Sequence, residues 1–219
     1  MNEYHKIQTV FKRSEESNYK ALVEGDFTLP EFELLKDVEW TWTEKIDGTN
    51  IRIMWDGETV RFGGRTENAQ IPTFLLSVLQ DTFLPEKMKA VFTDSNNVCL
   101  YGEGYGAKIQ KGDNYIPDRT DFILFDAKID DWWLSRENIE DVANSLGIKV
   151  VPIIGKGGLL YAVEYVKKGF TSTIASNKDY VAEGLIMKPT VDLFNRKGER
   201  IVAKIKHRDF YLTNKNTKK

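Results

Sequence analysis

Hydrophobic and polar residues alternate along several short stretches of the chain, and this period of two predicts β-strands. Residues 39–45 alternate throughout their length. Two further alternating stretches, 51–55 and 59–62, flank the dipeptide Asp56-Gly57, which is typical of tight hairpin turns. The predicted strands are residues 39–45, 51–55, 59–62, 98–102, 121–128, 149–154, 184–188 and 200–206.

Apolar residues spaced by three and four positions predict helices in three other places. Residues 73–92 have this spacing and are expected to form two helices, because Pro85 interrupts them. Ser135 is a suitable N-cap for a second helical region that ends at Gly147, and residues 159–168 form the third. The side chains predicted on one face of the first region are Phe74, Leu75, Val78 and Leu79.

The order of these elements indicates the fold class. Strands dominate the centre and both ends of the chain, with helices between them but no regular strand–helix–strand repeat. This order predicts an α+β fold with mostly antiparallel sheets flanked by helices. Because no repeat, low-complexity tract or long Pro/Gly/Ser linker interrupts the chain, residues 1–219 are expected to form a single domain.

The composition excludes several classes of protein. Hydrophobic residues make up 41% of the chain and charged residues 29%, as in soluble globular proteins. No apolar run is long enough for a membrane span or a signal peptide, so we expect no membrane partner and a cytoplasmic location. Cys99 is the only cysteine and stands in an apolar run, which predicts a buried thiol. With His5 and His207 as the only histidines, a zinc site or a His-activated nucleophile is not expected.

Charge is distributed unevenly along the chain. The net charge is −2, but residues 197–219 hold eight Lys and Arg against two acids, a charge of +6. A basic segment on an acidic body is typical of a polyanion-binding surface. A solvated tail is the alternative for residues 215–219, whereas Lys204 and Lys206 alternate with apolar residues and read as part of a strand.

The segment around Lys45 is the strongest candidate for chemistry. Lys45 stands between Glu44 and Asp47 and is followed by Gly48, which removes a side chain where a nucleotide would lie against the backbone. A nucleophilic lysine needs a lowered pKa, which desolvation or neighbouring positive charge can supply. Taken alone, these residues favour an exposed lysine before an Asp-Gly turn.

Four later segments carry polar residues inside strand-like runs, where such residues are costly unless they are used. In order after residues 45–48 they are 100–104 (LYGEG), 122–126 (FILFD), 183–188 (EGLIMK) and 202–206 (VAKIK). Five such segments in this order closely resemble motifs I, III, IIIa, IV and V of the covalent nucleotidyltransferases, the group of ATP-dependent ligases and mRNA capping enzymes. The resemblance spans about residues 40–210.

Within that group the chain most resembles the RNA ligases of the bacteriophage nick-sealing class. Thr49-Asn50 follows the glycine as in that class, and Arg65 lies twenty residues after the lysine, where that class also has an arginine. The resemblance implies a nucleotidyltransferase fold of two sheets, similar to ATP-grasp proteins. It also implies that residues 1–219 are one adenylation domain, without a separate oligonucleotide-binding barrel or helical C-terminal domain.

The resemblance implies a role for each matching residue. Lys45 would attack the α-phosphorus of ATP to form lysyl-AMP. AMP would then pass to an RNA 5′-phosphate, and a 3′-hydroxyl would displace it. The residues implied in catalysis are Lys45, Lys204, Lys206 and Asp47. Those implied in binding the nucleotide are Glu44, Lys45, Asn50, Arg65, Glu103, Phe125, Ile186, Lys204 and Lys206. Those implied in holding metal are Glu183 and Asp47.

The expected cofactors are ATP, bound covalently as AMP on Lys45, and Mg²⁺ with Mn²⁺ as a substitute. The expected partners are RNA ends or a nicked duplex, acted on by a monomer in a phage-infected bacterial cell. Weaker candidates for contacts with substrate are Arg52, Lys108, Lys111, Arg119 and Lys188. Several of these residues also have a plain structural alternative. It is a lysine pair on an edge strand for Lys204 and Lys206, a surface acid for Glu183, a turn acid for Glu103, a turn residue or surface cation for Asn50 and Arg65, a core aromatic for Phe125, and a solvated loop for Lys108, Lys111 and Arg119.

Three other functions remain open at this point. A minimal ATP-dependent DNA ligase is disfavoured by Thr49-Asn50. A non-catalytic nucleotide- or RNA-binding relic is disfavoured by the presence of both Lys45 and the pair Lys204 and Lys206. A capping guanylyltransferase is a more distant alternative, which labelling with ATP against GTP would separate.

Overall fold

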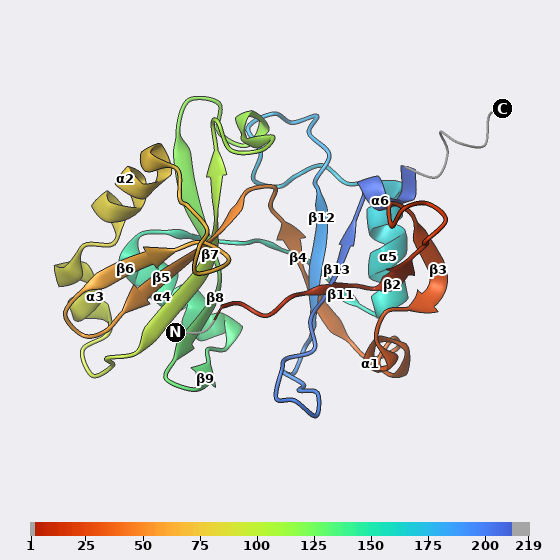
Figure 1. Ribbon diagram of the computed structural model, residues 1–219, viewed down its shortest axis with the longest axis horizontal. Helices are drawn as coiled ribbons and strands as arrows, with labels where there is room; N and C mark the ends of the chain where they lie inside the picture. Colours follow the sequence, from red (N-terminus) through yellow and green to blue (C-terminus); the bar gives the residue numbers. More distant parts are fainter. Residues whose placement is uncertain (1–2, 212–219) are drawn as a thin grey trace. The chain divides into compact units, whose positions relative to one another are not determined.

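A computed structural model describes residues 3–211, and contacts within it divide the chain into two units (Figure 1). Each unit is assembled from separated stretches of sequence, so neither is a continuous segment. Within the described range, unit 1 consists of residues 3–4, 47–151 and 175–177, and unit 2 of residues 5–46, 152–174 and 178–211. The basic positions 215, 218 and 219 lie outside the described residues.

Unit 1 is built on a twisted sheet with the strand order β10-β8-β7-β5-β6, and β9 also pairs with β8. All these pairings are antiparallel except that of β10 with β8. The strands are β5 (Thr49–Trp55), β6 (Val60–Gly63), β7 (Val98–Gly106), β8 (Thr120–Ile129), β9 (Trp132–Trp133) and β10 (Lys149–Val150).

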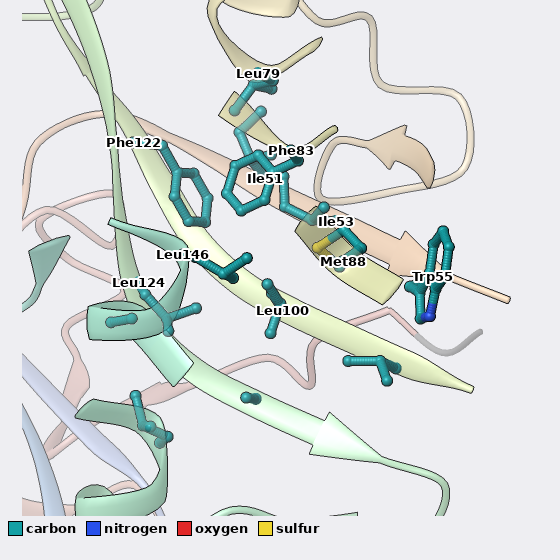
Figure 2. Close-up of a cluster of buried hydrophobic side chains, with 14 of the residues drawn as sticks. Ile51, Ile53, Trp55, Leu79, Phe83, Met88, Leu100, Phe122, Leu124 and Leu146 are labelled. Atoms are coloured by element: carbon teal, nitrogen blue, oxygen red, sulfur yellow. The ribbon is translucent and has the colours of Figure 1, made fainter. Parts of the chain in front are cut away.

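Helices pack on one face of this sheet and enclose the hydrophobic core of unit 1 (Figure 2). They are α2 (Thr73–Thr82), α3 (Pro85–Val91) and α4 (Arg136–Leu146), and a 3₁₀ turn, η1 (Gly112–Asn114), follows β7. The core joins Ile51 and Ile53 of β5 to Leu79 of α2 and Leu146 of α4. Burying such side chains is the main stabilising contribution to a unit of this kind.

Local sequence signals explain the boundaries of several elements in unit 1. Asp56 accepts hydrogen bonds from the backbone N–H groups of Glu58 (3.1 Å) and Thr59 (2.8 Å), and Gly57 takes a positive φ of 96°, which closes the predicted hairpin. The Ser135 hydroxyl accepts from the Asn138 N–H and begins α4 as predicted.

Unit 2 has a sheet with the order β1-β13-β12-β4-β11 and a separate hairpin of β2 and β3. The pairings are antiparallel except that β1 runs parallel to β13. In Figure 1, β12 lies between β4 and β13. The strands are β1 (Gln8–Thr9), β2 (Phe11–Arg13), β3 (Leu22–Phe27), β4 (Trp40–Lys45), β11 (Ile153–Gly157), β12 (Gly184–Pro189) and β13 (Ala203–Lys206).

The helix α5 packs against β12 and β13 and covers one face of this sheet. The helices of unit 2 are α1 (Pro30–Leu34), α5 (Leu159–Lys168) and α6 (Arg208–Tyr211). The core beneath α5 contains Trp40 and Trp42 of β4 and Leu185 and Met187 of β12. These residues occupy alternate positions of their strands, so the intervening side chains lie on the opposite face.

The predicted α+β class with mostly antiparallel sheets is confirmed. The prediction of one strand at residues 149–154 is wrong, because Pro152 separates β10, which pairs with β8, from β11, which pairs with β4 of another sheet. The strand predicted at 200–206 begins only at Ala203. Phe74 was expected on the buried face of its helix but is 39% exposed, whereas Leu75 and Leu79 are fully buried.

Candidate active site

Lys45 lies on the sheet face of unit 2 opposite α5. The register pairs Lys45 of β4 with Gly184 of β12, and Gly184 with Lys206 of β13. Directly opposed residues share one face of an antiparallel sheet, so Lys45 and Lys206 flank a position without a side chain. Two residues along the strands, the next row on the same face contains Thr43, Ile186 and Lys204. We call these two rows the lysine face.

Glu183 joins the two lysines of the first row. Its carboxylate is 2.6 Å from the Nζ of Lys45 through one oxygen and 2.6 Å from the Nζ of Lys206 through the other. The Glu183 side chain is 9% exposed, so the alternative of a surface acid does not apply. Burial alone would raise the pKa of the Glu183 carboxyl. The charges of Lys45 and Lys206 and their hydrogen bonds outweigh burial and hold this pKa below its ordinary value.

Lys204 and Lys206 occupy alternate positions of β13 and therefore point to one face, as the sequence predicted. Their strand lies between β1 and β12, which contradicts the alternative of a lysine pair on an edge strand. A strand with neighbours on both sides does not form an edge of the sheet, so its lysines do not face solvent there. The lysine face therefore brings together Lys45, Lys204 and Lys206, with the Glu183 carboxylate paired to Lys45 and Lys206.

Glu44 lies on the other face of β4 and is almost fully buried. Its carboxylate accepts a hydrogen bond from the Ser172 hydroxyl, and bonds from the backbone N–H (2.8 Å) and the hydroxyl (2.7 Å) of Thr173. Both oxygens thus hold the loop that leads towards Glu183. No local pattern pointed to Ser172 and Thr173, because their link to Glu44 spans more than 125 residues.

Unit 1 brings together Asn50 and Glu103, which are directly opposed on β5 and β7. The Asn50 Oδ1 is buried without a hydrogen-bond donor among the described residues, which is costly for an amide oxygen.

A side chain at Gly48 would place its Cβ 2.3 Å from the carbonyl oxygen of Gly104. The glycine after Asp47 is therefore required by the close approach of β7, and not only by a nucleotide as the sequence suggested.

Phe125 stands at a bulge in β8. The register passes from Tyr101 opposite Asp126 to Gly102 opposite Leu124, so Phe125 has no partner on β7. Bulges of this kind redirect a side chain and are common near functional sites. Phe125 is partly exposed, and the ring of Tyr4 contacts it edge-on at a centroid distance of 5.2 Å. The partial exposure removes the alternative of an ordinary core aromatic.

Tyr4 anchors the start of the chain to the same region of unit 1. Its hydroxyl donates a 2.7 Å hydrogen bond to the fully buried carboxylate of Asp126, and its ring also packs against Tyr101 and Trp133. The sequence carried no signal for this residue, because Tyr4 and Asp126 are 122 positions apart.

The other predicted site residues of unit 1 are Asp47 and Arg65. The backbone N–H of Asp47 donates to the Tyr115 hydroxyl at 3.1 Å, a contact that the sequence did not indicate. Arg65 follows β6 in a turn after Gly64 and is exposed. An exposed arginine in a short turn is free to bind an anion, but exposure alone is equally typical of a surface cation.

Three of the weaker candidates lie in the segment between β7 and β8. They are Lys108, Lys111 and Arg119, all of them exposed, and Lys108 lies 5.9 Å from the ring centre of Phe74.

The basic segment at residues 197–219 does not form one surface in its described part. Arg200 is buried with Asp192 at 3.8 Å, whereas Lys204 and Lys206 belong to the lysine face.

The described residues contain no ready-made metal cluster: among residues 3–211, no three His, Cys, Asp or Glu side chains gather as a ligand set. No helix in the described part of the chain is long and apolar enough to cross a membrane.

Known structures share the fold. Variants of Naegleria gruberi RNA ligase solved with ATP and Mn include an arginine-to-alanine variant with a TM-score of 0.68, 18% identity, and coverage of 98% of this chain and 58% of that chain. A glutamate-to-alanine variant has a TM-score of 0.64 and 20% identity, over 95% of this chain and 58% of that chain. This chain thus spans under two thirds of the length of these ligases.

The sequence itself matches the model of one protein family. The match covers residues 38–206, which include every motif segment from Lys45 to Lys206 and most of both units. The chain therefore belongs to the RNA ligase family.

Proposed function

We propose that the chain is an ATP-dependent RNA ligase that joins a 3′-hydroxyl to a 5′-phosphate through a lysyl-AMP intermediate. In the first step, the Lys45 amine forms a bond to the α-phosphorus of ATP and pyrophosphate leaves. AMP then passes from Lys45 to the RNA 5′-phosphate. In the last step, the 3′-hydroxyl oxygen bonds to that phosphorus and AMP leaves with the electron pair. Family membership and the lysine face support this proposal.

The observation that carries the proposal is the carboxylate of Glu183 between Lys45 and Lys206. Phosphoryl transfer depends on positioning and on neutralising negative charge more than on proton transfer. A face with three ammonium groups supplies that charge. Lys204 and Lys206 are proposed to bind the α-phosphate and to stabilise the charge that develops on it.

The ion pair with Glu183 also sets a condition for reaction. The Lys45 Nζ is held by the Glu183 carboxylate at 2.6 Å, whereas an amine attacks phosphorus through a free lone pair. Glu183 therefore has to release Lys45 before the first step. A triphosphate on the lysine face would offer its oxygens as alternative partners for Lys206 and Lys204. This exchange weakens the ion pairs that Glu183 forms with the lysines.

The residues present fit a divalent cation. Glu183 is the proposed carboxylate ligand, directly or through water, and Asp47 is proposed to assist in the later steps. The cation would supply charge neutralisation at the phosphates. The unsatisfied Oδ1 of Asn50 marks a place where a ligand or an ordered water completes the hydrogen bonding of unit 1.

Roles in nucleotide recognition belong to the same proposal. Phe125 stacks on the adenine, Ile186 contacts the base and Glu103 accepts a hydrogen bond from a ribose hydroxyl. Asn50 binds on the phosphate side, and Arg65 binds the ribose or the incoming 5′-phosphate. Glu44 acts on the nucleotide through the Ser172–Thr173 loop, because both its oxygens are already bonded there.

The finer assignments are also proposals. They are a single adenylation domain over residues 1–219, the nick-sealing class of bacteriophage ligases, a nicked duplex as substrate, a monomer and a cytoplasmic site of action. The order of the motif segments and Thr49-Asn50 support the class.

Labelling of the protein by ATP radiolabelled at the α-phosphate, followed by denaturing electrophoresis, tests the central step. We expect the wild type to carry the label and Lys45→Ala to lose it. Lys12→Ala is the matched control, since Lys12 is exposed and pairs with Asp26 in the β2–β3 hairpin. A labelled Lys45→Ala protein would show that another residue is the nucleophile.

Sealing assays separate the alternatives. All-RNA, all-DNA and mixed nicks distinguish an RNA ligase from a minimal DNA ligase, and we expect an RNA 3′-hydroxyl strand to be required. A folded wild-type protein that binds ATP without becoming labelled would instead support the non-catalytic relic.

A further inference from the structure

Arg52 is a fully buried cation in the middle of the sheet of unit 1. Its side chain is 2% exposed, on β5 two residues after Asn50. The register places it opposite Tyr101, which is itself opposite Asp126. Arg52 therefore lies in the row next to the Asn50–Glu103 pair and on the same face of the sheet.

A buried guanidinium is expensive to desolvate and is a poor way to stabilise a sheet, so its contacts indicate what it does. The Nε of Arg52 donates a 2.9 Å hydrogen bond to the carbonyl oxygen of Gly64, twelve residues along the chain. Its Nη1 is 3.8 Å from the carboxylate of Glu67, which is 78% exposed. Arg52 thus binds the turn after β6 at both ends.

That turn carries Arg65. Gly64 is the residue before Arg65, and Glu67 lies two residues after it, so Arg52 fixes the backbone on either side. The turn fits closely around this contact. A Cβ at Gly63 would lie 3.2 Å from Arg52 Nη2, and a Cβ at Gly64 would lie 2.7 Å from the Cβ of Ala69. The Glu67 N–H also donates to Glu3 at 3.1 Å.

We propose that Arg52 is a positioning residue that holds the Gly63–Glu67 turn so that Arg65 binds the 5′-phosphate of the adenylylated RNA end. The inference rests on the proposed ligase activity. Arg52 itself does not touch substrate: its Nε is engaged by Gly64 and its side chain is buried. An arginine suits this task because its planar group donates in several fixed directions, which a lysine cannot reproduce.

A double-mutant cycle on sealing of a pre-adenylylated RNA tests the proposal. Arg52→Met keeps most of the apolar stem and removes the donors, and Arg65→Ala removes the phosphate contact. We expect each to slow sealing by about 10- to 100-fold, the usual effect of losing one charge-assisted contact. The double variant is expected to be no slower than the worse single variant, because both changes remove the same contact.

Two further variants keep the test decisive. Arg61→Met is the matched control, since Arg61 lies on the same hairpin but is 71% exposed and pairs with Asp56; it should seal normally. Gly64→Ala disturbs the turn without altering Arg52 and should reproduce the loss if Arg52→Met does not fold. Amide hydrogen exchange should rise at residues 64–69 in Arg52→Met and stay at the wild-type rate in β7.

The outcomes distinguish this inference from the proposed function. If the wild type neither becomes labelled nor seals, the ligase proposal fails. If the wild type seals but the effects of Arg52→Met and Arg65→Ala multiply, or if Arg65→Ala seals normally, Arg52 does not act through Arg65 and the inference is overturned.

Discussion

The two units place different chemistry on their sheets. The lysine face of unit 2 holds Lys45, Lys204 and Lys206, and Glu183 forms ion pairs of 2.6 Å with Lys45 and Lys206. The corresponding rows of unit 1 hold an amide, a carboxylate and a buried arginine, with aromatic rings of Tyr4, Tyr101 and Phe125 around Asp126. This difference supports our proposal that unit 2 binds phosphate and that unit 1 recognises the nucleoside.

The difference extends to how each region is stabilised. A lysine can exchange a carboxylate for a phosphate at little geometric cost, because its ammonium group is a compact charge on a flexible stem. The contacts of Arg52 and Tyr4 are buried and directional, so they set positions and do not exchange easily. Changes in unit 2 should therefore affect the chemical step, and changes in unit 1 should affect recognition.

The largest effect is expected on the lysine face. Lys206→Ala should slow lysyl-AMP formation by about 10²- to 10³-fold, because a cation at the α-phosphate is lost. Stability should change little, since Lys45 still pairs with Glu183. Single-turnover labelling and a thermal melt measure the two quantities. Lys167→Ala is the control, because that lysine forms an exposed pair with Glu24. Normal labelling of the Lys206→Ala protein would contradict the claim that changes in unit 2 affect the chemical step.

A smaller effect is expected at the bulge in unit 1. Phe125→Leu keeps an apolar side chain but loses the flat ring, so the KM for ATP should rise about tenfold while the maximal rate changes little, as for the loss of one base-stacking contact. Phe194→Ala, at an exposed aromatic of unit 2, is the control. A fall in rate with an unchanged KM would place Phe125 in the chemical step instead.

The smallest expected effect is a dependence of stability on acid. The pKa of Glu183 is lowered in the folded protein, so its ion pairs contribute fully above the unfolded-state value of about 4.3 and are lost as the pH falls through the folded value. Glu183→Gln should therefore flatten the decline of unfolding free energy below about pH 4.3.

Lys45→Met sharpens this test. It removes one of the two cations that lower the pKa of Glu183, so the acid-dependent loss of stability should be smaller than in the wild type and should be complete at a higher pH. Denaturant melts at a series of acidic pH values measure both shifts. Identical pH profiles for the wild type, Glu183→Gln and Lys45→Met would show that the carboxylate is not held by these lysines.

The sequence by itself determined most of the elements and the motif residues. Asp56-Gly57 closed the predicted hairpin, Ser135 began α4, Pro85 began α3, and Lys204 and Lys206 shared one face of a strand. These features depend on turn chemistry, capping and the period of a strand, which act over a few residues and are legible in the local sequence.

Only the tertiary structure decided which distant groups meet. Glu183 lies 138 positions from Lys45, Glu44 binds Ser172 across 128, and Tyr4 reaches Asp126 across 122. The same is true of the split of 149–154 between two sheets and of the burial of Arg52 beneath Gly64. Such contacts depend on strand order and register, which the period of two does not encode, because many pairings of the same strands bury the same apolar faces.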